Sequence, residues 1–222
     1  TNINHVQKIA EILERLDRIE EAYQYYSYAW QLSNGDSSLE TKVHRLEDKL
    51  SEIYHDQLQT WINENPDHPD LPTQIEELER LKIEREERLV TVARDRVEKN
   101  PTDMQLRFEL GMHLYAARHA TEAIPELQKA KSNPHIRTKA MLILSNCYSD
   151  KNMIDLAIRQ LEEAVGELHS MDETKKSALY SLGHLHTKQG KKDLALDSWK
   201  QIYESDYSYK DIAKLVEESY GS

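Results

Sequence analysis

The sequence predicts an all-α solenoid, a stack of antiparallel helix pairs, and three observations carry the prediction. Small residues recur at two fixed spacings, since Gly111 is followed 12 residues later by Ala123 and 7 after that by Ala130. A polar break divides each copy of this pattern. The chain has only 6 glycines and 6 prolines in 222 residues, which favours helices over turns. Because one helix pair cannot bury its apolar faces alone, such pairs must stack.

The 12-and-7 spacing occurs in three further copies along the chain. They are Ala10–Ala22–Ala29, Ser145–Ala157–Ala164 and Gly183–Ala195–Ile202. The breaks between the two halves of the copies are Asp17-Arg18, Arg118-His119, Lys151-Asn152 and Gln189-Gly190. Each copy therefore predicts a helix of about three turns, a short turn and a second helix. The small residues predict close approach of the two helices.

A 34-residue helix–turn–helix unit of this kind resembles the tetratricopeptide repeat (TPR), here in an array of bacterial type. The matching residues are Leu110-Gly111, Leu114-Tyr115, Ala123, Leu127, Ala130 and Pro134 in one copy, Leu144, Tyr148, Ala157, Leu161 and Ala164 in the next, and Leu182-Gly183, Gly190, Ala195 and Trp199 in the third. Arg107 and Met141 stand where the family favours tryptophan. The resemblance implies a right-handed superhelix, with a TPR-like pair at 1–35 and repeats at 102–135, 136–172 and 173–206.

Residues 36–101 lack the repeat spacing and instead predict two long helices, at about 38–64 and 73–99. In the first, Leu39, Val43, Leu46, Leu50 and Ile53 form an apolar seam typical of a coiled coil. Two interpretations stay open. The segment is an antiparallel hairpin, or two fused degenerate repeats, that continues the solenoid. Alternatively, the hairpin projects and binds a partner or a second copy, which makes it a self-assembly module.

The two ends of the chain carry further expectations. Ser208 and Asp211 predict a capping box for a helix that closes the solenoid within 207–222. Near the other end, the aromatics of "YQYYSYAW" (23–30) surround their helix, which predicts burial by additional N-terminal repeats or by a homodimer. The chain begins with Thr1, so we also expect a longer protein. In that alternative this segment is the regulatory or targeting arm of a larger enzyme or envelope-associated protein whose functional domain precedes it.

Composition excludes several kinds of partner. The net charge of −11 argues against nucleic acid, whose binding relies on clustered Lys and Arg. No apolar run approaches the roughly 20 residues of a membrane span. The single cysteine, Cys147, gives no disulfide framework and leaves the compartment open, with the cytoplasm favoured.

We find no pattern that predicts catalysis, a metal or a cofactor. His184 and His186 are two residues apart, so a helix directs them about 200° apart and they cannot share one ion. His186 occupies a position expected to be core, and Cys147 is expected to be a small apolar filler. Glu76-Glu77 and Glu162-Glu163 are expected on solvated helix faces.

The predicted function is therefore a non-catalytic scaffold that binds a protein partner. The TPR resemblance implies a concave groove lined by the first helix of each repeat, suited to an extended peptide or a partner helix. Residues counted from the small position of each copy give the candidate groove: Phe108, Met112, Tyr115, Leu142, Asn146, Ser149, Tyr180, His184, Thr187 and Lys188. Phe108 and Leu142 have a second interpretation, as packing against the neighbouring repeat.

Overall fold

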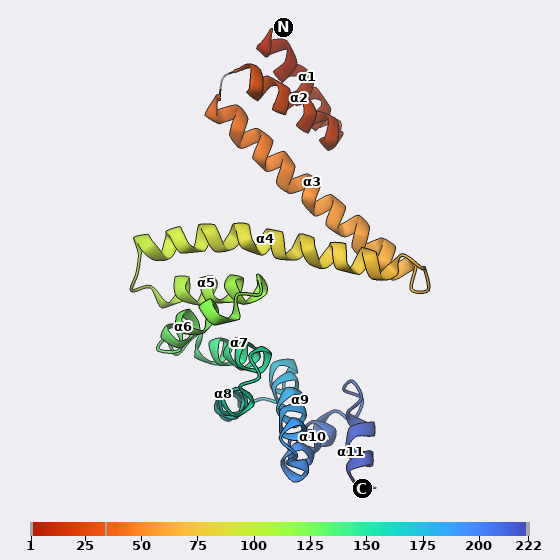
Figure 1. Cartoon of the computed structure of the whole chain (residues 1–222), viewed down its shortest axis with the longest axis vertical. Coiled ribbons are helices and arrows are strands. Elements are labelled where there is room, and N and C mark those ends of the chain that lie inside the picture. Colours follow the sequence, from red (N-terminus) through yellow and green to blue (C-terminus); the bar gives the residue numbers. More distant parts are fainter. Residues whose placement is uncertain (1, 34, 221–222) are drawn as a thin grey trace. The chain divides into compact units, whose positions relative to one another are not determined.

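The computed structural model describes residues 2–33 and 35–220, and within them it contains helices and no strand (Figure 1). The helices are α1 (Ile3–Arg15), α2 (Ile19–Leu32), α3 (Ser37–Glu64), α4 (Leu71–Lys99), α5 (Met104–Ala116), α6 (Ala120–Ala130), α7 (Arg137–Asp150), α8 (Ile154–Glu167), α9 (Glu173–Lys188), α10 (Lys192–Ser205) and α11 (Ile212–Tyr220). The all-α class is confirmed. None of the helices in the described ranges is long and apolar enough to cross a membrane.

The chain divides into two compact units, residues 1–81 and 82–222, whose boundary lies inside α4. In the first unit α1 and α2 form a pair in which Ala10, Ala22 and Ala29 are fully buried. These are the three small residues of the first copy. Their burial agrees with the close helix approach that the spacing predicts.

The apolar seam of α3 packs against α1 and α2. Leu39, Val43 and Leu46 are buried in the same core cluster as the α1–α2 pair, and Leu50 and Ile53 pack on its edge. Ion pairs continue this contact, from Lys42 to Glu11 (3.5 Å), Arg45 to Glu14 (2.5 Å) and Lys49 to Asp17 (3.0 Å). The interpretation in which this seam binds a partner or a second copy is therefore wrong for Leu39, Val43 and Leu46, because α1 and α2 cover them.

The later part of α3 and the early part of α4 have a thinner core. Leu58 and Leu78 are buried, whereas Tyr54 and Ile75 are about half exposed. In the connection, the ring of His68 meets Trp61 edge-on at 5.0 Å between centroids. The two long helices lie where the sequence places them, but the antiparallel hairpin remains a prediction.

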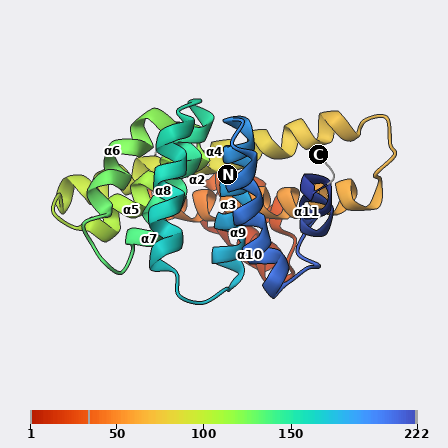
Figure 2. The same ribbon diagram turned by 90° about the horizontal axis from the view of Figure 1, so that it is seen from below.

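In the second unit, α5–α6, α7–α8 and α9–α10 are three consecutive helix pairs, which the second view also shows side by side (Figure 2). The small residues lie where the two helices of a pair meet. A Cβ added at Gly111 would lie 2.6 Å from Cγ of Leu127, and one at Gly183 would lie 2.5 Å from Cε2 of Trp199. Both distances are below 3.0 Å, closer than Cβ atoms approach other atoms in proteins, so a residue larger than glycine would have to displace Leu127 or Trp199.

The turn inside each pair has one repeated backbone conformation. Asp17, Arg118, Asn152 and Gly190 all have positive φ, at 56°, 68°, 58° and 73°. The following amide donates back across the helix end, as from His119 to the carbonyl of Leu114 at 2.8 Å. This is the Schellman arrangement, which satisfies the last carbonyls of the first helix. The polar breaks in the sequence are thus helix C-terminal caps.

The cap of the second unit begins later than expected. Ile212 and Val216 of α11 are buried with Trp199 and Ile202 of α10. The Ser208 hydroxyl donates to Asp206 at 2.8 Å instead of capping α11. The capping box predicted from Ser208 and Asp211 is therefore wrong, because Asp206 competes for the serine.

Candidate partner-binding groove

The candidate groove residues come from α5, α7 and α9, the first helices of the three consecutive pairs. Each set of three or four recurs at helical spacing and so lies on one side of its helix. The structure nevertheless gives them different surroundings. Some are buried, some are held by other parts of the fold, and some are exposed.

Phe108 and Leu142 follow the packing interpretation. Phe108 is 8% exposed and belongs to the core cluster that also contains Val90, Ala93 and Val97 of α4. Leu142 is partly buried against the same cluster. Phe108 therefore packs in the core beneath the candidate groove, and its side chain is not available to a partner.

Tyr180 and His184 are held by an aromatic cluster that secures the cap. The His184 ring lies 4.5 Å from Tyr180 and 5.4 Å from Trp199, both in edge-on geometry. The Tyr180 hydroxyl donates to Asp211 at 2.8 Å, and the Lys210 ammonium lies 4.3 Å from the Tyr180 ring. Through these contacts Tyr180 packs against the α10–α11 connection, so its ring and hydroxyl are already occupied within the chain.

Met112, Asn146, Thr187 and Lys188 form the exposed part of the candidate groove. Met112 is 38% exposed, and the side chains of the other three are also classed as exposed. Asn146 makes no side-chain hydrogen bond to any residue in the described ranges. Met112 and Asn146 directly follow the small residues Gly111 and Ser145, so they occupy equivalent places on successive helices.

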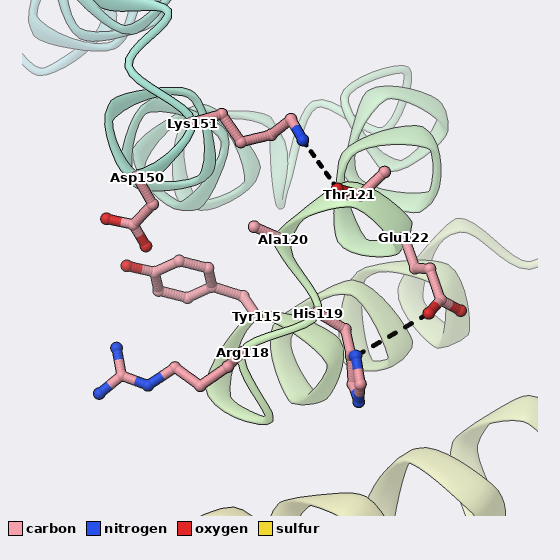
Figure 3. Close-up of a pocket in the computed structure, with 8 residues that line it drawn as sticks. All are labelled: Tyr115, Arg118, His119, Ala120, Thr121, Glu122, Asp150 and Lys151. Carbon is pink, nitrogen blue, oxygen red and sulfur yellow. Dashed lines mark hydrogen bonds and ion pairs between the residues drawn. The ribbon is translucent and has the colours of Figure 1, made fainter.

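Tyr115 stands at the edge of a pocket of about 420 Å³ where α5 ends and α6 begins. Its phenol points toward the carboxylate of Asp150, with Arg118 alongside (Figure 3). Burial, followed by the negative charge of Asp150 and a hydrogen bond to it, raises the pKa of Tyr115 to about 12. The phenol is therefore neutral at physiological pH and acts as a hydrogen-bonding group.

Most of the other residues that line the pocket are polar. The sequence predicts some of them only as turn residues and not as part of a site. Lys151 donates to the Thr121 hydroxyl at 2.8 Å, and His119 pairs with Glu87 at 2.6 Å. Arg118, His119 and Lys151 come from the breaks inside the repeats. Their nearness to Tyr115 follows from stacking the α5–α6 turn on the α7–α8 turn, which spacing within one repeat does not indicate.

Two titratable side chains, Cys147 and His186, are buried inside the solenoid. Burial, followed by the nearby Asp150 charge, raises the pKa of the Cys147 thiol to about 12. Burial also lowers the pKa of His186, against the opposing charge of Glu162, and its Nδ1 has no hydrogen-bond partner within the described ranges. Across those same ranges, no group of three His, Cys, Asp or Glu side chains is arranged to hold a metal.

Helix pairs of this length, with buried small residues at their crossing points and a repeated turn, define a TPR solenoid. The chain therefore has the fold of a TPR solenoid. No protein-family profile matches the chain.

Among curated proteins, the chain is similar to response regulator aspartate phosphatase E of Bacillus subtilis (strain 168). The two are 32% identical over 106 residues, which make up 46% of this chain and 28% of that phosphatase. The chain thus spans little more than a quarter of the length of this relative.

Among solved structures, the Naa15/Naa10 complex bound to HypK-THB aligns over 97% of this chain and 33% of its own, with a TM-score of 0.61 and 15% identity. MamA aligns over 60% of this chain and 75% of its own, with a TM-score of 0.52 and 17% identity. Both comparisons support the helical-repeat fold.

Proposed function

We propose that this chain is a non-catalytic scaffold that binds a peptide or helix of a partner protein along α5, α7 and α9. The observation that carries the proposal is that Met112 and Asn146 are exposed at equivalent places on α5 and α7, with exposed Lys188 one turn beyond the equivalent place on α9. Met112 offers apolar surface, Asn146 offers an unpaired amide, and Lys188 offers a cation. An amide of this kind can pair with the main chain of an extended ligand.

The contacts already described narrow this surface. Tyr180 and His184 are occupied by the aromatic cluster, and Phe108 is buried. The proposed contact residues are therefore Met112, Tyr115, Asn146, Ser149, Thr187 and Lys188, with Leu142 beside them. In most interfaces a few residues contribute most of the binding energy, so substituting one or two residues at the centre of this surface should strongly weaken binding.

The test starts from peptides selected on this chain from a displayed random library. Met112→Ala with Asn146→Ala should weaken the selected peptides by about tenfold or more in fluorescence anisotropy. Met153→Ala is the matched control, because Met153 is 40% exposed against 38% for Met112 but lies at the α7–α8 turn. Peptides that bind the double variant as tightly as the parent would place the binding site elsewhere.

A second candidate function rests on the similarity to response regulator aspartate phosphatase E. In this alternative the chain is the regulatory arm of a larger protein, and its solenoid binds a response regulator. Titration with a receiver domain carrying an aspartyl phosphate tests it by calorimetry. Binding without faster phosphate release supports an arm, and faster phosphate release would contradict the non-catalytic assignment.

A further inference from the structure

The α1–α2 pair has an apolar face that the first unit leaves open. Ile9, Ile12 and Leu16 follow one another at spacings of 3 and 4 along α1, and Tyr25, Tyr28 and Leu32 repeat the same spacings along α2. All six are substantially exposed, from 37% for Leu32 to 62% for Leu16. We refer to these six residues as the open face.

The open face lies opposite α3. Glu14 pairs with Arg45 of α3, and Ile12 and Leu16 are each two residues from it, about 200° around the helix. On α2, Trp30 meets the His44 ring of α3 at 6.3 Å, and Tyr28 is likewise two residues away. The two helices therefore present their exposed apolar residues on the same side, away from the layer that already covers them.

Charged residues at the edges of the open face are complementary. Arg15 ends α1, and Glu20 lies in the first turn of α2, so both stand next to the connecting turn. Neither side chain forms an ion pair or hydrogen bond with any described residue, although both are exposed. The α1 edge is thus basic and the α2 edge acidic.

We propose that the open face binds the open face of a second copy of this chain, as an antiparallel four-helix layer. A two-fold axis parallel to the helices places α1 of one copy over α2 of the other with both turns at the same end. Arg15 then stands at the level of Glu20 in the second copy. The open face is therefore self-complementary in charge.

The size of the open face limits the strength of the proposed dimer. Two helices of 13 and 14 residues are each about 20 Å long and pack about 10 Å apart, so they present a surface of about 20 by 20 Å. That is about 400 Å² per copy, below the roughly 600–1,000 Å² that each partner contributes to a standard interface and in the size range of weak, transient contacts. We therefore expect a weak dimer, with a dissociation constant of at least tens of micromolar, on the order of 10⁻⁵ M or above. This proposal is independent of the groove function.

Sedimentation equilibrium over a micromolar concentration series tests the dimer. Ile12→Asp should raise the dimer dissociation constant by about tenfold or more, because it places a charge in the centre of the contact. Val92→Asp is the control, since Val92 of α4 is 58% exposed against 56% for Ile12. Circular dichroism of both variants checks that the helices remain folded.

Charge exchange tests the orientation. Arg15→Glu and Glu20→Arg should each weaken the dimer severalfold, and the double variant should restore it. A chain that stays monomeric at the highest concentration overturns the proposal. So does a dimer that Ile12→Asp leaves as strong as Val92→Asp does. A dimer lost with Ile12→Asp but not restored in the double exchange would overturn the antiparallel arrangement.

Discussion

The helix pairs and the long helix α3 are stabilised in different ways. Inside a pair, two helices meet at glycine, alanine or serine, and a single extra methyl group has no space at Gly111 or Gly183. Along the first half of α3, Leu39, Val43 and Leu46 are buried against α1 and α2. Exposed ion pairs, such as that between Lys49 and Asp17, add to this contact. The pairs therefore depend on the volume of individual residues, whereas α3 depends on a broad apolar stripe. Substitutions in the helix pairs and on α3 test this difference.

The largest effect is expected at the crossing point of α9 and α10. Gly183→Ala should lower the free energy of unfolding by about 2 kcal/mol, because the new methyl group meets the rigid Trp199 ring. Gly166→Ala is the control. It lies in α8 with nothing near its Cβ position, so alanine should stabilise by up to about 1 kcal/mol. Chemical denaturation followed by circular dichroism measures both, and equal stabilisation would contradict the close approach.

Arg107 stands where the TPR resemblance leads us to expect tryptophan, and it is held by a largely buried ion pair. It lies 2.5 Å from Glu126, with side-chain exposures of 14% and 16%, and also donates to the carbonyl of Pro101. Arg107→Met should lower the free energy of unfolding by about 1–2 kcal/mol at neutral pH, since Glu126 loses that partner. Arg159→Met, at an exposed position of α8, should change it little.

The effect of Arg107→Met should depend on pH. Burial tends to raise the pKa of Glu126, but hydrogen bonds from Arg107 and Lys129 outweigh it and hold the pKa below its usual value. A depressed carboxyl pKa contributes stability above the unfolded pKa, near 4.3, and that stability is lost as the pH falls through the folded pKa. The difference between parent and variant should therefore shrink in denaturation experiments below about pH 4. A constant difference would argue against the ion pair.

Substitutions at the turn residues with positive φ should change the free energy of unfolding by a smaller amount. The sign of the change should depend on which side chain is replaced. Gly190→Ala should destabilise by about 1 kcal/mol, because alanine is strained at a φ of 73°. Arg118→Gly should stabilise by up to about 1 kcal/mol for the same reason. Asn152→Gly should fall between them, as asparagine tolerates this conformation. Thermal melts of the three variants should give this order, and any other order would question the shared turn.

The smallest effect is expected on α3. Lys49→Ala removes the ion pair with Asp17, whose side chains are 49% and 82% exposed, and should cost less than about 0.5 kcal/mol. The difference should disappear at high salt, because exposed charges are screened. A large effect in melts at low salt that disappears at high salt would mean that α3 depends on charge more than on its apolar stripe.

Much of the fold follows from local rules in the sequence. The small residues at spacings of 12 and 7 identify the helix pairs because each marks a crossing point, and the prolines and capping residues bound α3 and α4. The partner of an apolar stripe does not follow in the same way. Leu39, Val43 and Leu46 indicate a buried side, but only the position of α1 and α2 determines what buries it.

The candidate groove was less predictable for a related reason. Spacing places Tyr180 and His184 on the same side of α9 as Lys188. It cannot show that the α10–α11 connection returns over them, bringing Tyr209, Lys210 and Asp211 into contact. Lys210 has a φ of 48°, so this path depends on an unusual backbone conformation that periodicity does not encode. The pocket beside Tyr115 was missed because it joins two different repeats.

The buried thiol of Cys147 can report local opening of the solenoid around α7. Cys147 is the only cysteine, it is fully buried in α7, and its pKa of about 12 keeps it protonated at ordinary pH. A thiol reagent can therefore react only while the α7–α8 region is open, so the rate of labelling gives the frequency of that event. Comparing the labelling rate with and without a ligand bound to α5, α7 and α9 would then show whether binding makes this opening less frequent. No engineered cysteine is needed.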